Sequence, residues 1–322
     1  MSSIEKAKKI DGLMRHLRDD CGIAISGSKR KQQLTQYGYY HGYKGYRFFN
    51  HATNRIPYTN FDEIVAVIEY ENEIKRIVYP ALMFIEMAVK NIALSVIVPD
   101  MKDTSIHCIY QVKMNDDVTN RNLKVKHLKI RDRIQRTLSD SYTHKNTMVS
   151  HFYNRGEEVP LWGVFEILML GDFADLLQCL NKDVREEIAD SLGMNVRYDT
   201  DSKLVANALF TIKSFRNATA HNNIVFDARF KDRDANKNLI HWVEATTGIT
   251  GIRFEVLPDY LALIFVMLKH IGYPKSKSIR LLNEYRESLN SLYKCVSLPI
   301  YNKIVHTGIR GKLLKLENYI KN

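Results

Sequence analysis

Apolar residues recur at intervals of three and four along most of this chain, and this spacing constrains the fold more than any other feature of the sequence. The pattern is longest between Phe61 and Val98, where it passes through Ile64, Ile68, Ile74, Ile77, Leu82, Ile85, Val89, Ile92 and Val96. Side chains at this spacing share one face of an α-helix, so the pattern predicts a long helix with a buried face. Pro80 lies inside the stretch and predicts a kink or a break.

Shorter runs of the same spacing predict further helices, and with only 15 Gly and 7 Pro in 322 residues we expect a mostly α fold. These helices cover Ile4 to Leu17, Arg121 to Leu138, Val159 to Leu180, Asn181 to Leu192 (ended by Gly193) and Leu204 to Phe215. The segments between them are predicted to include a turn-rich, tyrosine-rich connector at Gln36 to Phe49, a charged loop at Lys231 to Asn238, and a turn or short hairpin at Thr246 to Gly251.

The charge balance favours a polyanionic partner. Lys and Arg outnumber Asp and Glu by 47 to 36, which gives a formal net charge of +11 and an isoelectric point near 9.3. Nucleic acid is the first such partner and an anionic membrane surface the second, but no continuous apolar run approaches the ~20 residues that span a bilayer. The first ten residues also lack the apolar stretch of a secretory signal. We therefore expect a cytoplasmic protein with no membrane partner.

The basic residues gather in two places. The segment RNLKVKHLKIRDRIQRTL, from Arg121 to Leu138, predicts an amphipathic helix with a basic face, and ten Lys and Arg against three acidic residues follow from Lys275 to the end. Either set contacts an RNA backbone or forms a plain solvated surface. The residues that we predict to contact RNA are Lys124, Lys126, Lys129, Arg133, Arg136, Lys275, Lys277, Arg280, Lys312 and Lys315.

The segment SFRNATAHNN, which begins at Ser214, places an arginine, an asparagine and a histidine together. Asn217 and His221 are four residues apart and share a helical face, which the long Arg216 side chain can reach. An imidazole can accept or donate a proton near neutral pH, and a guanidinium can hold a phosphate, so the three residues suit attack of a ribose 2′-hydroxyl on an RNA phosphodiester. Asn217 would orient the imidazole or contact the ribose.

Two considerations limit this hypothesis and extend it. An Arg followed five residues later by His is expected about once by chance in such a chain, and Arg121 with His127 forms a looser copy in which the histidine falls in an apolar stripe. A structural polar cluster at a helix start is the alternative for Arg216 and His221. Because one such histidine is too few for separate acid and base roles, we expect a symmetric homodimer to complete the site.

The cysteines suggest neither a metal site nor a disulfide framework. Cys21, Cys108, Cys179 and Cys295 lie far apart, without the paired spacing of a zinc site. We expect reduced core or surface thiols, no metal and no cofactor.

The string FRNATAHNN resembles the Arg-Asn-x-x-x-His signature of the Abi-like (AbiD/AbiF) family of bacterial phage-defence proteins, a branch of the HEPN superfamily. Three other strings resemble blocks of that family in the family's order, so that the resemblance extends from Leu34 to Phe226. They are GYYHGYKGYRFF, IEMAVKNIAL and FYNRGEEVPLWGVFEILMLGDFADLLQCL.

The resemblance implies a helical HEPN core, dimerisation, and abortive infection or toxin-like growth arrest by RNA cleavage, in some members with a small structured noncoding RNA. Arg216 and His221 match the catalytic pair, and Asn217 matches the polar residue after the arginine. The chain departs from the pattern where Lys90 replaces an arginine usual four residues after Glu86, and an arginine usual near the tyrosine block is missing. This implies a weakened or altered phosphate contact.

Several side chains have a supporting role in this hypothesis, each with a plainer alternative. Glu86 and Lys90 form an i,i+4 pair that is more often an ion pair than a catalytic couple. Tyr39 and Tyr40 could stack on unpaired bases, although packing is the commoner role for such a block.

The expected organisation follows from these assignments. Residues 1–60 would be an N-terminal helical and tyrosine-rich segment, 61–230 a HEPN-like helical bundle, and 231–322 a basic C-terminal helical extension, or the chain would form one compact domain. The expected function is metal-independent endoribonuclease activity in phage defence. The alternative is an RNA-binding scaffold of HEPN-like fold that does not cleave.

Overall fold

The computed structural model describes residues 8–114, 120–232 and 234–322, and in these stretches it contains fifteen α-helices and no strand. The prediction of a mostly α fold is therefore confirmed. The α-helices are α1 (Ile10–Arg15), α2 (Gly27–Tyr39), α3 (Phe61–Ile97), α4 (Ile106–Val112), α5 (Arg121–Thr143), α6 (Thr147–Tyr153), α7 (Leu161–Ile167), α8 (Leu170–Cys179), α9 (Lys182–Ser191), α10 (Leu204–Ala220), α11 (Lys237–Thr247), α12 (Leu257–His270), α13 (Lys275–Cys295), α14 (Leu298–Ile304) and α15 (Ile309–Lys321). Two π-helical turns, η1 (His16–Asp20) and η2 (Tyr40–Lys44), and one 3-10 turn, η3 (Val98–Asp100), complete the elements.

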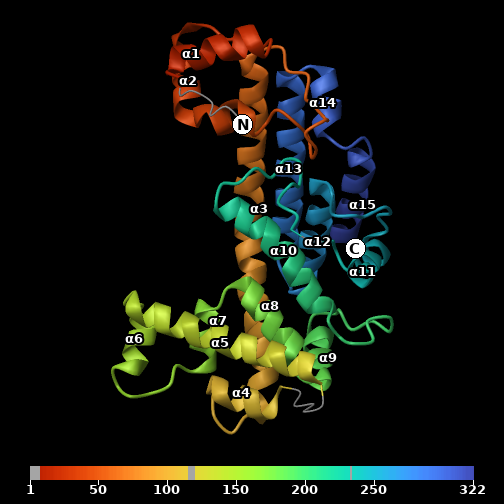
Figure 1. Cartoon of the computed structure of the whole chain (residues 1–322). Helices are drawn as coiled ribbons and strands as arrows, with labels where there is room; N and C mark the ends of the chain where they lie inside the picture. The colour runs from red at the N-terminus through yellow and green to blue at the C-terminus, as the bar shows by residue number, and fades with distance from the viewer. Residues whose placement is uncertain (1–7, 115–119, 233) are drawn as a thin grey trace.

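Helix α3, 37 residues long, runs through most of the height of the molecule (Figure 1). It begins with a capping box, in which the Asn60 side chain accepts a hydrogen bond from the Glu63 backbone amide and the Glu63 carboxylate accepts one from the Asn60 backbone amide. Pro80 does not end the helix, so the expectation of a break there is wrong. Because Pro80 is exposed, the carbonyl left without its usual partner can be solvated, and packing of both flanking segments keeps the helix continuous.

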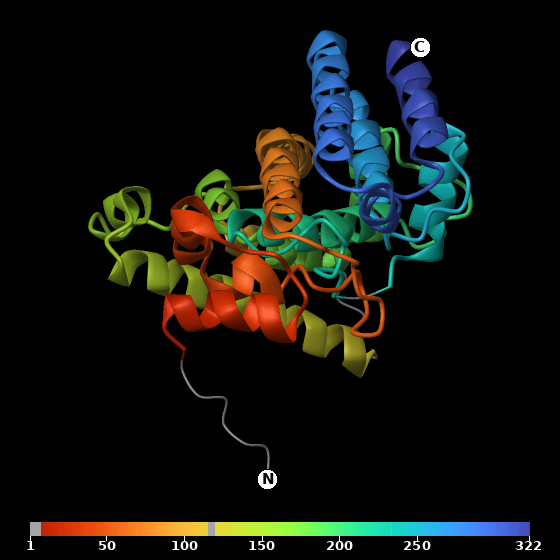
Figure 2. The ribbon, with the colours of Figure 1, turned by 90° about the horizontal axis from the view of Figure 1, so that it is seen from above.

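The other helices surround α3 in three groups (Figure 1). Helices α1 and α2 lie at the end where α3 begins, and α4 to α9 surround the end where it stops. Helices α10, α12 and α13 pack along α3, and α11, α14 and α15 pack against these helices from outside. Seen from above, α13 and α15 stand on one side of α3 and α6 lies on the other (Figure 2). One continuous apolar cluster joins buried residues of all three groups, such as Leu34, Phe173, Leu263 and Leu316. The boundaries at 60/61 and 230/231 stay predictions.

Two predicted segments differ from the structure. The single helix expected from Val159 to Leu180 is two helices, α7 and α8, because Leu168 and Met169 take extended backbone conformations. The carbonyl that this break releases at Leu168 accepts a hydrogen bond from Lys90. The tyrosine-rich segment is helical as far as Lys44, and its only interruption is Gly38 with a φ of 70°.

The remaining predicted ends can be compared directly. Helix α9 is followed by Gly193 with a φ of 61°, as expected. Helix α10 extends to Ala220, beyond the predicted Phe215. Helix α11 begins at Lys237, within the predicted charged loop, and continues to Thr247. It ends at Gly248, whose left-handed backbone with a φ of 69° forms a turn and not the alternative hairpin. The first predicted helix begins at Ile10, and its residues 4–7 lie outside the described residues.

Helix α3 also has the length and hydropathy of a membrane span, but half of its most apolar stretch is buried inside the protein. Core helices of soluble proteins have the same character. Because α3 packs against α7, α9, α10, α12 and α13, the structure is consistent with a soluble protein. The cytoplasmic location stays a prediction.

Candidate functional site

The polar segment around Arg216 forms the last turns of α10 rather than the start of a helix. Arg216 and Asn217 are half-buried inside the helix, and His221 is the exposed residue that caps its C-terminal end. The helix continues this far because Ala218 and Thr219 still pack inward, and the Thr219 hydroxyl bonds to the Phe215 carbonyl. The alternative prediction placed this polar cluster at a helix start, and that placement is wrong.

Arg216 joins α10 to α3. Its Nη1 donates to the side-chain oxygen of Asn217 at 3.1 Å, and its Nε lies 3.1 Å from Glu86 Oε2. That second contact is an ion pair but not a hydrogen bond, since neither atom has a hydrogen-bond partner in the described residues. Both atoms are buried. The Arg216 side chain is 25% exposed, so the guanidinium can be reached from solvent.

The predicted supporting pair belongs to the same group of side chains. Lys90 Nζ donates to Glu86 Oε1 at 3.0 Å and to the Leu168 carbonyl, at the break between α7 and α8, at 2.7 Å. Lys90 therefore keeps a cation beside Glu86, at the position where the resemblance implied an arginine. We call Glu86, Lys90, Arg216 and Asn217 the Arg216 cluster.

His221 stands next to this cluster with its imidazole uncommitted. It lies five residues after Arg216, which is about 7.5 Å along the helix axis, and on the same face as Asn217. Only its backbone amide is bonded, to the Asn217 carbonyl at 2.9 Å, and across the described ranges its ring makes no hydrogen bond or ion pair. A substrate can therefore meet the imidazole without displacing another side chain.

The loop after His221 is fastened to α3 by buried charges that the sequence analysis missed. Asn222, with a φ of 53°, accepts a hydrogen bond from Lys75 Nζ at 2.8 Å, and Lys75 also pairs with Glu71 at 2.7 Å. The other Glu71 oxygen accepts the backbone amides of Val225 at 2.9 Å and Phe226 at 3.1 Å. Glu71 is fully buried, so each of these bonds forms away from water.

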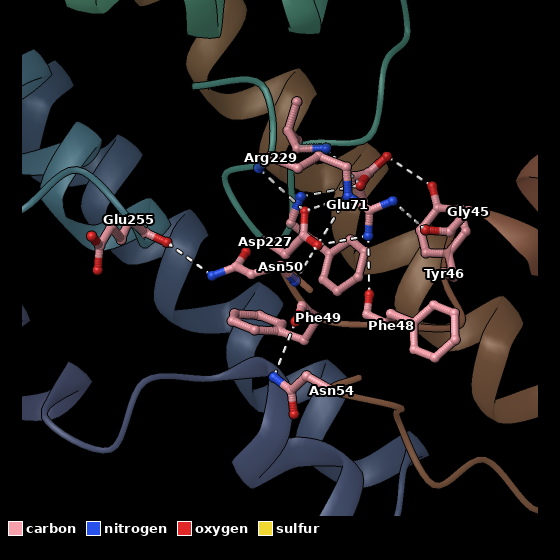
Figure 3. A network of polar contacts seen from close by, with 12 residues as sticks. Gly45, Tyr46, Phe48, Phe49, Asn50, Asn54, Glu71, Asp227, Arg229 and Glu255 are labelled. Atoms are coloured by element: carbon pink, nitrogen blue, oxygen red, sulfur yellow. Dashed lines mark hydrogen bonds and ion pairs between the residues drawn. The ribbon is translucent and has the colours of Figure 1, made fainter. Parts of the chain in front are cut away.

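The same network holds the tyrosine-rich segment (Figure 3). The Tyr46 hydroxyl donates to Glu71 at 2.7 Å, and Arg229 donates to the Gly45 and Phe48 carbonyls at 2.8 and 3.0 Å. Arg229 also pairs with buried Asp227 at 2.6 Å. Burial, together with the charge of Glu71, raises the pKa of Tyr46 far above its ordinary value, which keeps the phenol a donor. We call Tyr46, Glu71, Lys75, Asp227 and Arg229 the Glu71 network.

One sequence signal could have identified the network. Glu71 and Lys75 are charged residues four apart on the face of α3 that the apolar pattern buries, and such residues are rarely buried unless paired. Their partners at Tyr46 and Val225 are far away in the chain, so the sequence could not name them.

The predicted tyrosine contacts separate into two kinds. Tyr39 is half-buried, and its hydroxyl is 3.1 Å from His16 Nε2. Tyr40 is 56% exposed and presents its ring to solvent. Tyr43 and Tyr46 of the same block are almost fully buried. Tyr40 is thus the residue of this block that is best placed to stack on a base.

On α5 the predicted contacts also separate. The side chains of Lys124, Lys126 and Lys129 are exposed. Arg133 instead binds Asp172 and Asp175, each at 2.7 Å, while Arg136 pairs with Asp132 at 2.9 Å. The buried position of His127, expected from the apolar stripe, is confirmed, since it is 2% exposed.

In the C-terminal extension the predicted residues have partners within the protein. Lys312 is buried and lies 2.5 Å from Asp259. Lys315 donates to the Gly248 carbonyl and Lys275 to the Lys321 carbonyl. Lys277 lies over the ring of Tyr273, and Arg280 is 3.6 Å from a carboxylate oxygen of Glu284. RNA contacts by these residues stay predictions.

The four cysteines are free thiols, and two of them, Cys108 and Cys179, are buried. Burial raises the pKa of Cys179 to about 11. Among residues 8–114, 120–232 and 234–322 no group of three His, Cys, Asp or Glu side chains is arranged to hold a metal ion.

Comparison with known proteins gives one match. The sequence model of the family described as Abi-like protein matches residues 32–227, more than half of the chain, and this span contains the Arg216 cluster, His221 and Asp227. No curated protein and no solved structure matches the chain.

Proposed function

The chain belongs to the Abi-like protein family, which indicates a role in abortive infection and phage defence, and we propose that it acts there by cleaving RNA. We assign it to the HEPN superfamily as a metal-independent endoribonuclease. The observation that carries this proposal is the exposed, uncommitted imidazole of His221 at the end of α10, five residues after Arg216, whose half-buried side chain pairs with Glu86.

The proposed reaction needs a base, an acid and a phosphate contact. His221 takes the proton of a ribose 2′-hydroxyl, the 2′-oxygen attacks the adjacent phosphorus, and the 5′-oxygen leaves with a proton. The products are a 2′,3′-cyclic phosphate and a free 5′-hydroxyl. Arg216 binds the phosphate oxygens as their charge develops, and Asn217, which accepts from Arg216, holds the guanidinium in place.

A second copy of the chain would supply the acid. Two exposed methionines lie near the Arg216 cluster: Met87, 51% exposed, follows Glu86, and Met169, 68% exposed, follows Leu168, whose carbonyl binds Lys90. Exposed apolar side chains beside a polar site are a common feature of association surfaces. This supports a homodimer in which each His221 serves as the acid for the reaction at the other copy.

The direct test is cleavage of RNA by the purified full-length protein in EDTA, with cyclic-phosphate ends as the readout. We expect His221→Ala to lower the rate by about 10²- to 10⁴-fold, the range of a general acid–base group. Its thermal midpoint should not change, because the ring is exposed. Asn223→Ala, an exposed neighbour in the same loop, is the matched control and should cleave like the parent. Cleavage that persists in His221→Ala removes His221 from the mechanism.

The second function is an RNA-binding scaffold without cleavage, favoured by the exposed Lys124, Lys126 and Lys129 on α5 and by the net charge of +11. Binding without cleavage in both parent and His221→Ala would support it. Sequencing of RNA that copurifies from the native host would show whether a small structured noncoding RNA is bound.

A further inference from the structure

Helices α13, α14 and α15 enclose a groove of about 780 Å³ that lies outside the segment matched by the family. Its lining includes exposed or half-buried side chains of all three helices, namely Arg286, Tyr293, Leu298, Tyr301, Arg310 and Leu314. The groove is also far from the Arg216 cluster. Leu292 on α13 lines the same cleft as Ala66 on α3, and Ala66 is 20 residues, or about 30 Å, from Glu86 along that helix.

Part of the positive charge at this groove is not neutralised. No Asp or Glu is among the described residues that line it, and Arg286 is the lining cation with a carboxylate partner, Glu317. Arg310 lines the groove, and Lys294 and Lys303 adjoin lining residues; all three are exposed and make no hydrogen bond or ion pair with the described chain. Other basic residues of the extension, such as Lys312 and Lys315, are bonded elsewhere. Arg310 is therefore an uncommitted cation in the lining, and Lys294 and Lys303 follow lining positions by one residue in the sequence.

Exposed rings lie between these cations. Tyr293 is 56% exposed, and its ring centre is 5.1 Å from that of Tyr301 in an edge-to-face arrangement of 83°. This geometry leaves a face of Tyr293 available for stacking. Leu298 and Leu314, 55% and 57% exposed, extend the apolar surface. Grooves that bind single-stranded nucleic acid combine these features, because the cations follow the backbone while the rings stack on bases.

We propose that this groove binds unpaired nucleotides of RNA, with Tyr293 stacking on a base and Arg310, Lys294 and Lys303 contacting phosphates. The inference rests on the proposed function in that RNA is the substrate or the bound regulator. It adds a second contact, remote from the phosphate that is cleaved, that selects RNAs with a single-stranded segment long enough to reach both places.

Stacking is tested by fluorescence anisotropy with a labelled 12-mer of 2′-O-methyl uridine, whose blocked 2′-oxygen cannot attack the phosphate. Tyr293→Ala should weaken binding by about 5- to 150-fold, the range of one base stacked on an aromatic ring. Tyr293→Phe keeps the ring and should bind like the parent. Because Tyr293 is exposed, both variants should keep the parent's thermal midpoint. Parent-like binding by Tyr293→Ala would overturn the stacking assignment.

Charge is tested by Arg310→Glu against Lys182→Glu, which makes the same change of net charge on α9. Lys182 lies in the first turn of its helix, where a carboxylate is favoured, so the control should fold. Arg310→Glu should weaken binding strongly, and the slope of log affinity against log salt concentration should fall by about 0.7 for each phosphate that the variant no longer neutralises. Equally weakened binding in the two variants would mean that only overall charge matters and would overturn the proposal.

The remaining occupant to consider is a second copy of the chain. Sedimentation velocity without RNA should give the same mass for parent and Tyr293→Ala; a mass that falls in the variant while its RNA affinity is unchanged would assign the groove to self-association. These results are separable from cleavage. Weaker binding in the groove variants stands even if His221→Ala still cleaves, and parent-like binding in them leaves the His221 assay unaffected.

Discussion

The two groups of buried charges along α3 differ in how completely their hydrogen bonds are made. In the Glu71 network, each Glu71 oxygen accepts from two donors: Tyr46 and Lys75 on one side, two backbone amides on the other. In the Arg216 cluster, Glu86 Oε2 and Arg216 Nε are buried without a hydrogen bond. Buried polar groups without partners are costly and therefore rare. The Glu71 network therefore holds the loop in place with a full set of hydrogen bonds, whereas the Arg216 cluster relies at this contact on the ion pair of Glu86 with Arg216.

Removing the central carboxylate of the Glu71 network should have the largest effect on folding. Glu71→Ala leaves a buried lysine, a phenol and two amides without their acceptor, so we expect a decrease of about 3–5 kcal/mol in the free energy of unfolding. Glu86→Ala should cost less, since Lys90 keeps the Leu168 carbonyl and Arg216 keeps Asn217. Urea denaturation of both variants measures this, and equal decreases would contradict the comparison.

Removing the guanidinium of the Arg216 cluster should affect activity rather than folding. Arg216→Ala should lower RNA cleavage by about 10²- to 10³-fold, the usual effect of deleting a group that stabilises developing charge. Arg229→Ala is the matched control, since it should lower the thermal midpoint by removing the bonds to Asp227, Gly45 and Phe48. An Arg216→Ala protein that cleaves normally but unfolds early would reverse the two assignments.

A single hydrogen bond of the Glu71 network should give a smaller, measurable change. Tyr46→Phe removes one donor to Glu71 while keeping the ring that stacks on Phe226, with centres 5.4 Å apart. We expect a decrease of about 1 kcal/mol in unfolding free energy. Tyr40→Phe changes an exposed phenol and should leave stability unaltered. A neutral Tyr46→Phe would show that the network tolerates a missing donor.

A histidine outside both groups should give the smallest effect, on the pH dependence of stability. Burial, with a contribution from Lys269, lowers the pKa of His270 below its ordinary 6.5. The unfolded chain then takes up a proton more readily than the folded chain, so stability falls as pH drops below about 6.5. His270→Gln should flatten the fall in thermal midpoint between pH 7.5 and 5.5. An unchanged slope in this variant would assign the acid sensitivity to other groups.

Local periodicity was sufficient to predict the longest helices, but it missed α2, α4, α6 and α11 and did not locate the interruptions. The spacing identified α3, α5, α9 and α10, because each has a long apolar stripe facing the core. It failed at Leu168, where no proline marks the break and a lysine on another helix takes up the freed carbonyl. At Pro80 the break that local rules allow does not occur, since packing on both sides keeps the helix continuous.

The candidate site was predicted in part. The sequence identified Arg216, Asn217 and His221, and also the Glu86 and Lys90 pair that the structure places beside the arginine. The Glu71 network was missed because the contacts that join its α3 residues to the loop after α10 link positions 147 to 155 residues apart, which no local pattern reveals. The bonding of Lys312 to Asp259 was likewise invisible, since a basic helical face does not show which of its charges are neutralised.

Pro80 divides α3 between the two places that contact α10 and the loop after it. Glu71 and Lys75, on one side, hold the loop that carries the imidazole, and Glu86, on the other, faces the guanidinium. A proline supplies no amide to the carbonyl four residues earlier, so the helix is least stiff at that turn. Bending at this one turn would therefore move the two anchor points of α10 and its loop, Arg216 and Asn222, relative to each other, while the helix itself fixes the spacing of Arg216 and His221.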